Sequence, residues 1–154
     1  MPDSTIQWQV RLYSAFSLHE LEAWLALRQQ VFVVEQNCPY PDIDGRDAQA
    51  LHLCGYDEDR LVAGARLFAP EGISGSRIGR VVVAPDARGI GLGRILMQQA
   101  MLECEARWPG QAILVSAQAH LQSFYASLGF DAISGIYDED GIPHIDMRCE
   151  RGLS

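Results

Sequence analysis

Short segments of the chain follow two hydrophobic patterns, one with a period of two residues and one with helical spacing. Residues 7–12 alternate apolar and polar side chains, which predicts a first strand. Residues 17–20, Ser-Leu-His-Glu, form a capping box, so we expect a helix to begin there. Two prolines in residues 37–42 cannot continue a helix and predict its end. The apolar face of this helix takes in Leu18, Leu21, Trp24, Leu25, Arg28 and Phe32.

The rest of the chain also contains both strand-like and helix-like hydrophobic patterns. Two β-rich runs at 51–56 and 61–68 flank the polar turn 57–60 and predict a hairpin. After them the pattern predicts a strand at 77–83, a glycine-rich turn, a helix that ends near residue 108, an apolar strand at 112–117, a helix at 121–128 ended by Gly129, and a terminal hairpin of strands 131–137 and 142–148. This order predicts an α/β (α+β) fold, with a mixed, mostly antiparallel central sheet, one β-α-β crossover and flanking helices.

Composition narrows the class of protein. The 154 residues are enough for a single domain, 1–154, with a sizeable core. A formal net charge of −8 argues against a nucleic-acid-binding surface, which is normally basic. The sequence contains no long apolar run and no targeting peptide, so we expect no membrane association. The four cysteines are widely spaced, which favours reduced thiols and the cytoplasm, and no histidine pair has metal-ligand spacing, so we expect no metal.

The glycine-rich turn is the most informative motif. Residues 88–93 read Arg-Gly-Ile-Gly-Leu-Gly and lie between a predicted strand and a predicted helix. Such a turn presents free backbone N–H groups at the positive end of the helix dipole, which favours a phosphate or pyrophosphate, and Arg88 can add a charge-assisted contact. The spacing does not fit the Rossmann fingerprint, and no lysine follows as in a P-loop. The simpler alternative is a left-handed turn that only joins the strand to the helix.

With its flanking strand, this turn resembles the coenzyme A pyrophosphate loop of the GNAT superfamily of acetyltransferases. Residues 124–130, Phe-Tyr-Ala-Ser-Leu-Gly-Phe, resemble a second segment of that family, in which a tyrosine on the last helix is followed by Gly-Phe. The two motifs stand in the family's order and cover about residues 78–130. Residues 27–40, 44–47 and 141–145 are similar to the ElaA-like subgroup, which consists of small bacterial acetyltransferases.

The resemblance implies an N-acetyltransferase that moves the acetyl group of acetyl-CoA directly to a primary amine of a small molecule or peptide, and it implies a homodimer. Tyr125 would protonate the departing CoA thiolate as general acid. The family often has Asn where this chain has Gln118. The cofactor-binding residues that the resemblance assigns are Val81, Val82, Val83, Arg88, Gly89, Ile90, Gly91, Leu92, Gly93, Arg94 and Gln118. The alternative is a non-catalytic acyl-CoA-binding or regulatory module on the same fold, against which Tyr125 argues.

The sequence leaves the general base and the acceptor open. Glu35 ends the first predicted helix beside the proline-containing loop, and His144 lies in the terminal hairpin. Each is a candidate catalytic base, and each has a purely structural alternative. For His52, which begins a predicted strand, we favour a structural histidine that is satisfied by hydrogen bonds.

Asp42, Asp44 and Asp47 form a cluster of carboxylates on one predicted loop. The cluster could bind a cationic amine or could be an ordinary solvated turn. A second resemblance, carried by Arg28, Phe32, Asp44, Asp47 and Arg66, is to acyl-homoserine lactone synthases, which share the GNAT scaffold. We interpret this likeness as shared architecture, in which the two arginines pair with the aspartates to hold the acceptor loop.

Overall fold

A mixed sheet forms the centre of the computed structural model, which describes residues 6–72 and 74–150. Within these residues eight strands follow the order β1-β2-β3-β4-β5-β8-β6, and β7 also pairs with β8. The contact between β4 and β5 is parallel, and the other strand pairs are antiparallel. The strands are β1 Ile6–Leu12, β2 Leu51–Asp57, β3 Arg60–Phe68, β4 Ser76–Val83, β5 Ile113–Gln118, β6 Asp131–Ala132, β7 Tyr137–Glu139 and β8 Ile142–Cys149. The predicted α/β fold class and its order of elements are confirmed.

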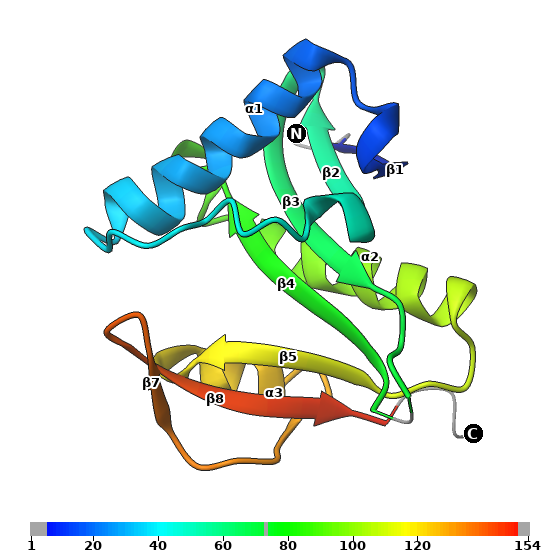
Figure 1. The fold of residues 1–154 in the computed structure, drawn as a ribbon, viewed down its shortest axis with the longest axis vertical. Helices are drawn as coiled ribbons and strands as arrows, with labels where there is room; N and C mark the ends of the chain where they lie inside the picture. The colour runs from blue at the N-terminus through cyan, green and yellow to red at the C-terminus, as the bar shows by residue number, and fades with distance from the viewer. Residues whose placement is uncertain (1–5, 73, 151–154) are drawn as a thin grey trace.

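Helices cover both faces of this sheet. The helix α1 crosses one face over β3 and β4, and α2 lies against the opposite face of the same strands (Figure 1). The helices are α1 Leu18–Arg28, α2 Leu92–Arg107 and α3 Gln122–Ala126, with a π-helical segment η2 Gln29–Glu35 and the 3-10 turns η1 Tyr13–Ala15, η3 Asp47–Gln49, η4 Pro85–Ala87 and η5 Ala119–Leu121. In the described part of the chain, none of these helices is long and apolar enough to cross a bilayer.

The face of the sheet under α1 is packed around Trp24, which is fully buried. A Cβ atom added at Gly64 would lie 2.3 Å from the Trp24 ring, so the indole requires glycine beneath it. The indole N–H donates to Nδ1 of His52, and Nε2 of His52 donates to the backbone carbonyl of Asp47. With both ring nitrogens engaged and no exposed surface, His52 is the structural histidine that we predicted.

Local sequence signals placed the first helix correctly at its start. The hydroxyl of Ser17 accepts the N–H of Glu20 and the Glu20 carboxylate accepts the N–H of Ser17, as a capping box requires. The helix continues past Arg28 to Glu35, as predicted, but residues 29–35 form the π-helical segment η2, and the apolar periodicity did not indicate this change of helix type. The chain then leaves the helix at Asn37, whose φ of 51° is left-handed, just before the two prolines.

The prediction of a strand over all of residues 131–137 is wrong. Of this segment, only the residues in β6 and β7 pair with β8, and residues 133–136 between them leave the ladder. The physical reason is local, because the side-chain hydroxyl of Ser134 accepts the N–H of Asp146 in place of a backbone carbonyl. The helix predicted over 121–128 is also shorter, and ends before Gly129 at a φ of 102°.

Candidate active site

The centre of the sheet opens between β4 and β5. The two strands pair only where residues 76–78 face 113–115, and they diverge beyond that point (Figure 1). At the divergence β4 carries a bulge against β3, where the register shifts between Gly64 and Arg66 and Arg80 has a φ of 49°. The divergence leaves backbone groups of β4 without partners on β5, so they are available to a ligand.

A cavity of about 620 Å³ lies where β4 ends and α2 begins. Its walls come from β4, the glycine-rich turn, the first turn of α2, η2 and α3. Ile90 does not line it and has a side chain that is 73% exposed. The structure brings together the other ten predicted cofactor-binding residues here: Val81, Val82, Val83, Arg88, Gly89, Gly91, Leu92, Gly93, Arg94 and Gln118.

The glycine-rich turn presents backbone N–H groups to this cavity. Gly89 and Gly91 have φ angles of 92° and 79°, which side chains other than glycine adopt at a cost. Gly91 is the N-cap of the 16-residue helix α2, whose first N–H groups have no partner within the helix. The aligned peptide dipoles add partial positive charge there, so the turn suits an anion.

Glu35 and Arg88 form an ion pair on the wall of this cavity, which we call the cofactor cavity after the predicted residues that line it. Nη1 and Nη2 of Arg88 lie 2.5 and 2.8 Å from the two carboxylate oxygens of Glu35, and Nε of Arg88 donates to the carbonyl of Val83. The hydrogen bonds from Arg88 lower the pKa of Glu35. Glu35 lines the cofactor cavity and does not line the second cavity, which adjoins it.

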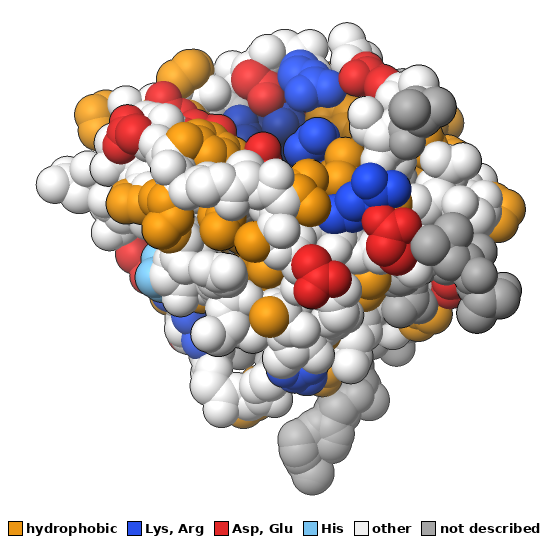
Figure 2. Space-filling view, turned by 90° about the horizontal axis from the view of Figure 1, so that it is seen from below, with side chains coloured by type: hydrophobic (Ala, Val, Ile, Leu, Met, Phe, Trp, Pro, Cys, Tyr) orange, Lys and Arg blue, Asp and Glu red, His pale blue; other side chains and the backbone are white. Residues whose placement is uncertain are grey.

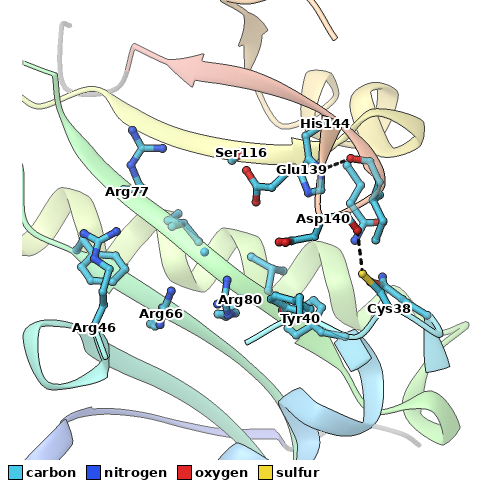
Figure 3. Close-up of a pocket in the computed structure, with 18 residues that line it drawn as sticks. Cys38, Tyr40, Arg46, Arg66, Arg77, Arg80, Ser116, Glu139, Asp140 and His144 are labelled. Carbon is cyan, nitrogen blue, oxygen red and sulfur yellow. Dashed lines mark hydrogen bonds between the residues drawn. The ribbon is translucent and has the colours of Figure 1, made fainter. Parts of the chain in front are cut away.

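A second cavity of about 200 Å³ adjoins the first (Figure 3). The two cavities share Phe32, Gln36, Val81 and Gln118, so they meet where β4 and β5 diverge. The second cavity has β3 and β4 on one side, the loop after η2 on another, and the β7–β8 hairpin opposite. The polar side chains that line it and are labelled in Figure 3 are those of Cys38, Tyr40, Arg46, Arg66, Arg77, Arg80, Ser116, Glu139, Asp140 and His144.

Three aspartates and three arginines form a network beside this second cavity. Arg28 donates through Nε to Asp42 at 3.0 Å and through Nη1 to Asp47 at 2.9 Å. Arg66 donates through Nη1 and Nη2 to Asp44 at 2.9 Å each, and through Nη1 to Asp47 at 3.0 Å. The predicted pairing of both arginines with the aspartates is therefore present.

Arg80 completes this network, although no local sequence pattern indicated it. Its Nε lies 2.8 Å from Asp42 and its Nη2 lies 3.4 Å from Asp44. The hydrogen bonds from Arg66 hold the pKa of Asp44 well below its usual value. With three cations and three anions, the network is balanced in charge.

His144 lies at the opposite side of the second cavity and is 9% exposed. Its Nδ1 is 2.8 Å from the carbonyl oxygen of Ile142. A carbonyl can only accept, so Nδ1 carries the hydrogen, and the neutral ring then has its lone pair on Nε2. His144 is the register partner of Gln118, which both cavities share.

Tyr125 is 6% exposed and packs between Phe124 and Phe130. It lines neither cavity, although the preceding residue Phe124 lines the cofactor cavity. Within the described residues its hydroxyl has no hydrogen-bond partner, and burial raises its pKa to about 12. The phenol therefore keeps its proton at neutral pH.

Comparison with known proteins gives consistent matches over nearly the whole chain. A family model described as an acetyltransferase (GNAT) domain matches residues 22–151. Protein ElaA of Escherichia coli (strain K12) is 45% identical over 148 residues, which are 94% of this chain and 97% of that protein.

Solved structures agree with the sequence matches. The crystal structure of Escherichia coli ElaA has a TM-score of 0.89 at 44% identity and covers 95% of this chain and 100% of that one. An acyl-CoA N-acyltransferase from Pseudomonas aeruginosa also has a TM-score of 0.89, at 42% identity, over 94% of this chain and 99% of that one. The acyl-homoserine lactone synthase LasI has a TM-score of 0.76 at 14% identity, covering 96% and 91% of the two chains, which is a likeness of fold alone.

Proposed function

The chain belongs to the GNAT acetyltransferase family, and on this basis we propose that it transfers acetyl from acetyl-CoA directly to a primary amine. The observation that carries the proposal is the meeting of two cavities at the divergence of β4 and β5. One cavity ends on an anion-binding turn, and the other is lined by charged side chains, so a thioester and an amine can meet at their junction.

In this proposal the backbone of β4 and the glycine-rich turn hold the cofactor. The amides of residues 88–94 bind the pyrophosphate at the N-terminus of α2, and Arg94 adds positive charge. The pantetheine arm pairs with the free edge of β4 at Val81, Val82 and Val83, as an added strand would. Gln118, at the junction, offers its side-chain amide to the arm in place of the asparagine that is common in the family.

The chemistry requires an attacking neutral amine, a stabilised oxyanion and a proton for the leaving thiolate. Free backbone N–H groups of β4 supply the oxyanion stabilisation. Tyr125 supplies the proton, because a phenol is protonated at neutral pH and no hydrogen-bond partner among the described residues occupies its hydroxyl. Proton transfer of this kind contributes about 10²–10⁴ in rate.

For the base we propose His144, acting directly or through a water. Its Nδ1 is engaged by a backbone carbonyl, which leaves the Nε2 lone pair to take a proton from the amine. Glu35 is the weaker candidate, because the ion pair with Arg88 lowers its pKa and it lines the cofactor cavity.

A non-catalytic acyl-CoA-binding module remains the second candidate, because Tyr125 lines neither cavity. Turnover of acetyl-CoA with an amine, measured for wild type and Tyr125→Phe, separates the two candidates. The enzyme proposal expects kcat to fall at least tenfold in the variant while the Kd for CoA stays the same. A module would give no amine-dependent turnover in either protein.

The cofactor site itself is tested by calorimetric titration of CoA against Gly93→Glu and Gly93→Ala. Gly93 has no left-handed φ, and a Cβ there meets nothing within 4 Å, so both variants should fold. The carboxylate of Gly93→Glu would stand at the anion-binding helix end and abolish binding, while Gly93→Ala keeps it. Equal CoA binding by both variants would place the pyrophosphate elsewhere.

A further inference from the structure

The distribution of unpaired arginines marks places for anions. All twelve basic residues of the chain are arginine, and Arg151 is outside the described residues. Eight of the described arginines have a carboxylate partner: Arg11, Arg28, Arg60, Arg66, Arg80, Arg88, Arg107 and Arg148. The three described arginines that lack one are Arg46, Arg77 and Arg94, and each of them lines one of the two cavities.

Arg94 lines the cofactor cavity, where the proposed function expects a pyrophosphate. Arg46 and Arg77 line the second cavity, which the proposed function gives to the amine and which we call the acceptor cavity, and acetyl transfer itself requires neither of them. Both are neighbours of Phe68: Arg77 is its register partner across β3 and β4, and the Arg46 guanidinium is 4.4 Å from the ring centre. Both appear at the same end of the cavity (Figure 3).

Arg66 and Arg80 also line the acceptor cavity, but their charges are already compensated. They belong to the network of three arginines and three aspartates, which has no net charge. The free positive charge of the cavity therefore comes from Arg46 and Arg77. A view of the surface shows arginine side chains gathered in a hollow, with acidic side chains beside it (Figure 2).

The other end of the cavity carries the opposite charge. Glu139 ends β7 and Asp140 follows it in the tight turn before β8, and neither has a basic partner among the described residues. They lie beside His144, the register partner of Gln118 at the junction with the cofactor cavity. The negative end is therefore the end at which the thioester would arrive.

We propose that the acceptor is an amine that also carries an oxyanion, either a carboxylate or a phosphate. Arg46 and Arg77 bind the oxyanion, and Glu139 and Asp140 attract the ammonium group toward the thioester. Arg77 precedes Val81 by four residues, which is at most about 13 Å of strand, because the bulge at Arg80 shortens it. This spacing favours acceptors in which several bonds separate the amine from the oxyanion. The inference rests on the proposed acetyl transfer and adds the acceptor's chemical class.

The experiment compares amines of equal chain length that differ in their second end. The probes are ω-amino acids from β-alanine to ε-aminocaproate, the matching alkylamines, the matching diamines and the matching aminoalkylphosphonates. We expect kcat/KM for an amino acid or aminophosphonate to exceed that of its alkylamine at least tenfold, and the better of the two identifies the oxyanion. Equal turnover of the alkylamine, or a preference for the diamine, would overturn the inference.

Variants assign the preference to the two arginines. Arg46→Gln and Arg77→Gln should each remove about tenfold to a hundredfold in kcat/KM for the oxyanion-bearing amine, mostly through KM. Arg60→Gln is the matched control, because Arg60 pairs with Asp86 on the surface and lines neither of these cavities. A preference that survives both cavity variants would also overturn the inference.

Binding measurements keep this test separate from the test of the proposed function. A protein that does not bind CoA refutes the acetyl-transfer proposal, whereas one that acetylates neutral amines equally well refutes the acceptor class alone. If no probe is acetylated, titration of the CoA complex with ε-aminocaproate tests the oxyanion site directly. Binding that Arg77→Gln abolishes supports the oxyanion site, and no binding overturns it.

Discussion

Replacing Arg28 with methionine tests whether the charge network holds the acceptor loop. Arg28 is fully buried, and its guanidinium makes three hydrogen bonds, to the carboxylates of Asp42 and Asp47 and to the backbone carbonyl of Asp42. Methionine keeps the aliphatic volume but leaves three aspartates against two arginines. The change therefore removes one buried cation while it leaves most of the packing intact.

Removing one partner of a buried ion pair typically costs about 3–5 kcal/mol. The lower end applies here, because Asp42 keeps Arg80 and Asp47 keeps Arg66 as partners. For a chain of this length, each kcal/mol corresponds to about 2–4 °C in Tm, so a loss of about 3 kcal/mol predicts a fall of about 6–12 °C. Adding Asp47→Asn to Arg28→Met restores the charge balance and should recover at least about 1 kcal/mol.

Thermal and urea unfolding at several pH values provide the assay. Burial acts to raise the pKa of Asp47, but hydrogen bonds from Arg28 and Arg66 outweigh it, so its pKa is lowered. A carboxyl with a lowered folded-state pKa stabilises the protein above its unfolded pKa of about 4, and that stability is lost as the pH falls through the folded value. The difference in free energy of unfolding between wild type and Arg28→Met should therefore be largest at pH 7 and should decrease below about pH 4.

Two results would refute this reasoning. The first is a Tm loss at pH 7 no greater than that of Arg60→Met, which breaks an exposed pair worth less than about 1 kcal/mol. The second is a difference in free energy of unfolding that stays constant down to pH 3. Such a difference would come from lost packing, which does not depend on protonation. Either result would mean that the network does not stabilise the loop through its charges.

Three further predictions follow from the site. Gly79→Val should lower acceptor kcat/KM at least tenfold with CoA binding unchanged, because Gly79 lines the acceptor cavity without a left-handed φ, and a Cβ there meets nothing within 4 Å; an unchanged acceptor KM would place the amine elsewhere. The pKa of Tyr125, raised to about 12 by burial, predicts no loss of kcat up to pH 10, and a fall with a midpoint near 10 that is absent in Tyr125→Phe would contradict it. Cys54 and Cys104 should not react with Ellman's reagent until the protein is denatured, because they are 0% and 1% exposed and line neither cavity, and rapid labelling of either would disprove their burial.

Local patterns in the sequence were sufficient for the order of elements and for ten residues that the structure gathers around one cavity. The capping box, the glycine-rich turn and the β-branched strand before it can each be recognised from a few consecutive residues. The pairing of Arg28 with the aspartates also came from one neighbourhood of the chain. Such features depend on short-range geometry, which sequence expresses directly.

The acceptor side could not be predicted, because its residues meet only through the tertiary fold. Arg46 precedes η3, Arg77 is on β4 and Glu139 ends β7, and no local motif links them. The ion pair of Glu35 with Arg88 could not be predicted for the same reason, since Arg88 lies 53 residues further along the chain. The break between β6 and β7 depends on the hydroxyl of Ser134 replacing a backbone acceptor, which no hydrophobic pattern records.

The exclusive use of arginine has a consequence for a protein proposed to hold an activated acetyl group. A lysine amine beside a thioester is itself a nucleophile, and acetylation would remove its charge. A guanidinium stays protonated at any physiological pH and does not compete for the acyl group. With no lysine in its sequence, the chain offers acetyl-CoA no side-chain amine to modify. Its ion pairs therefore persist at any acetyl-CoA concentration, and no acetyl-lysine in a reaction mixture can come from the protein itself.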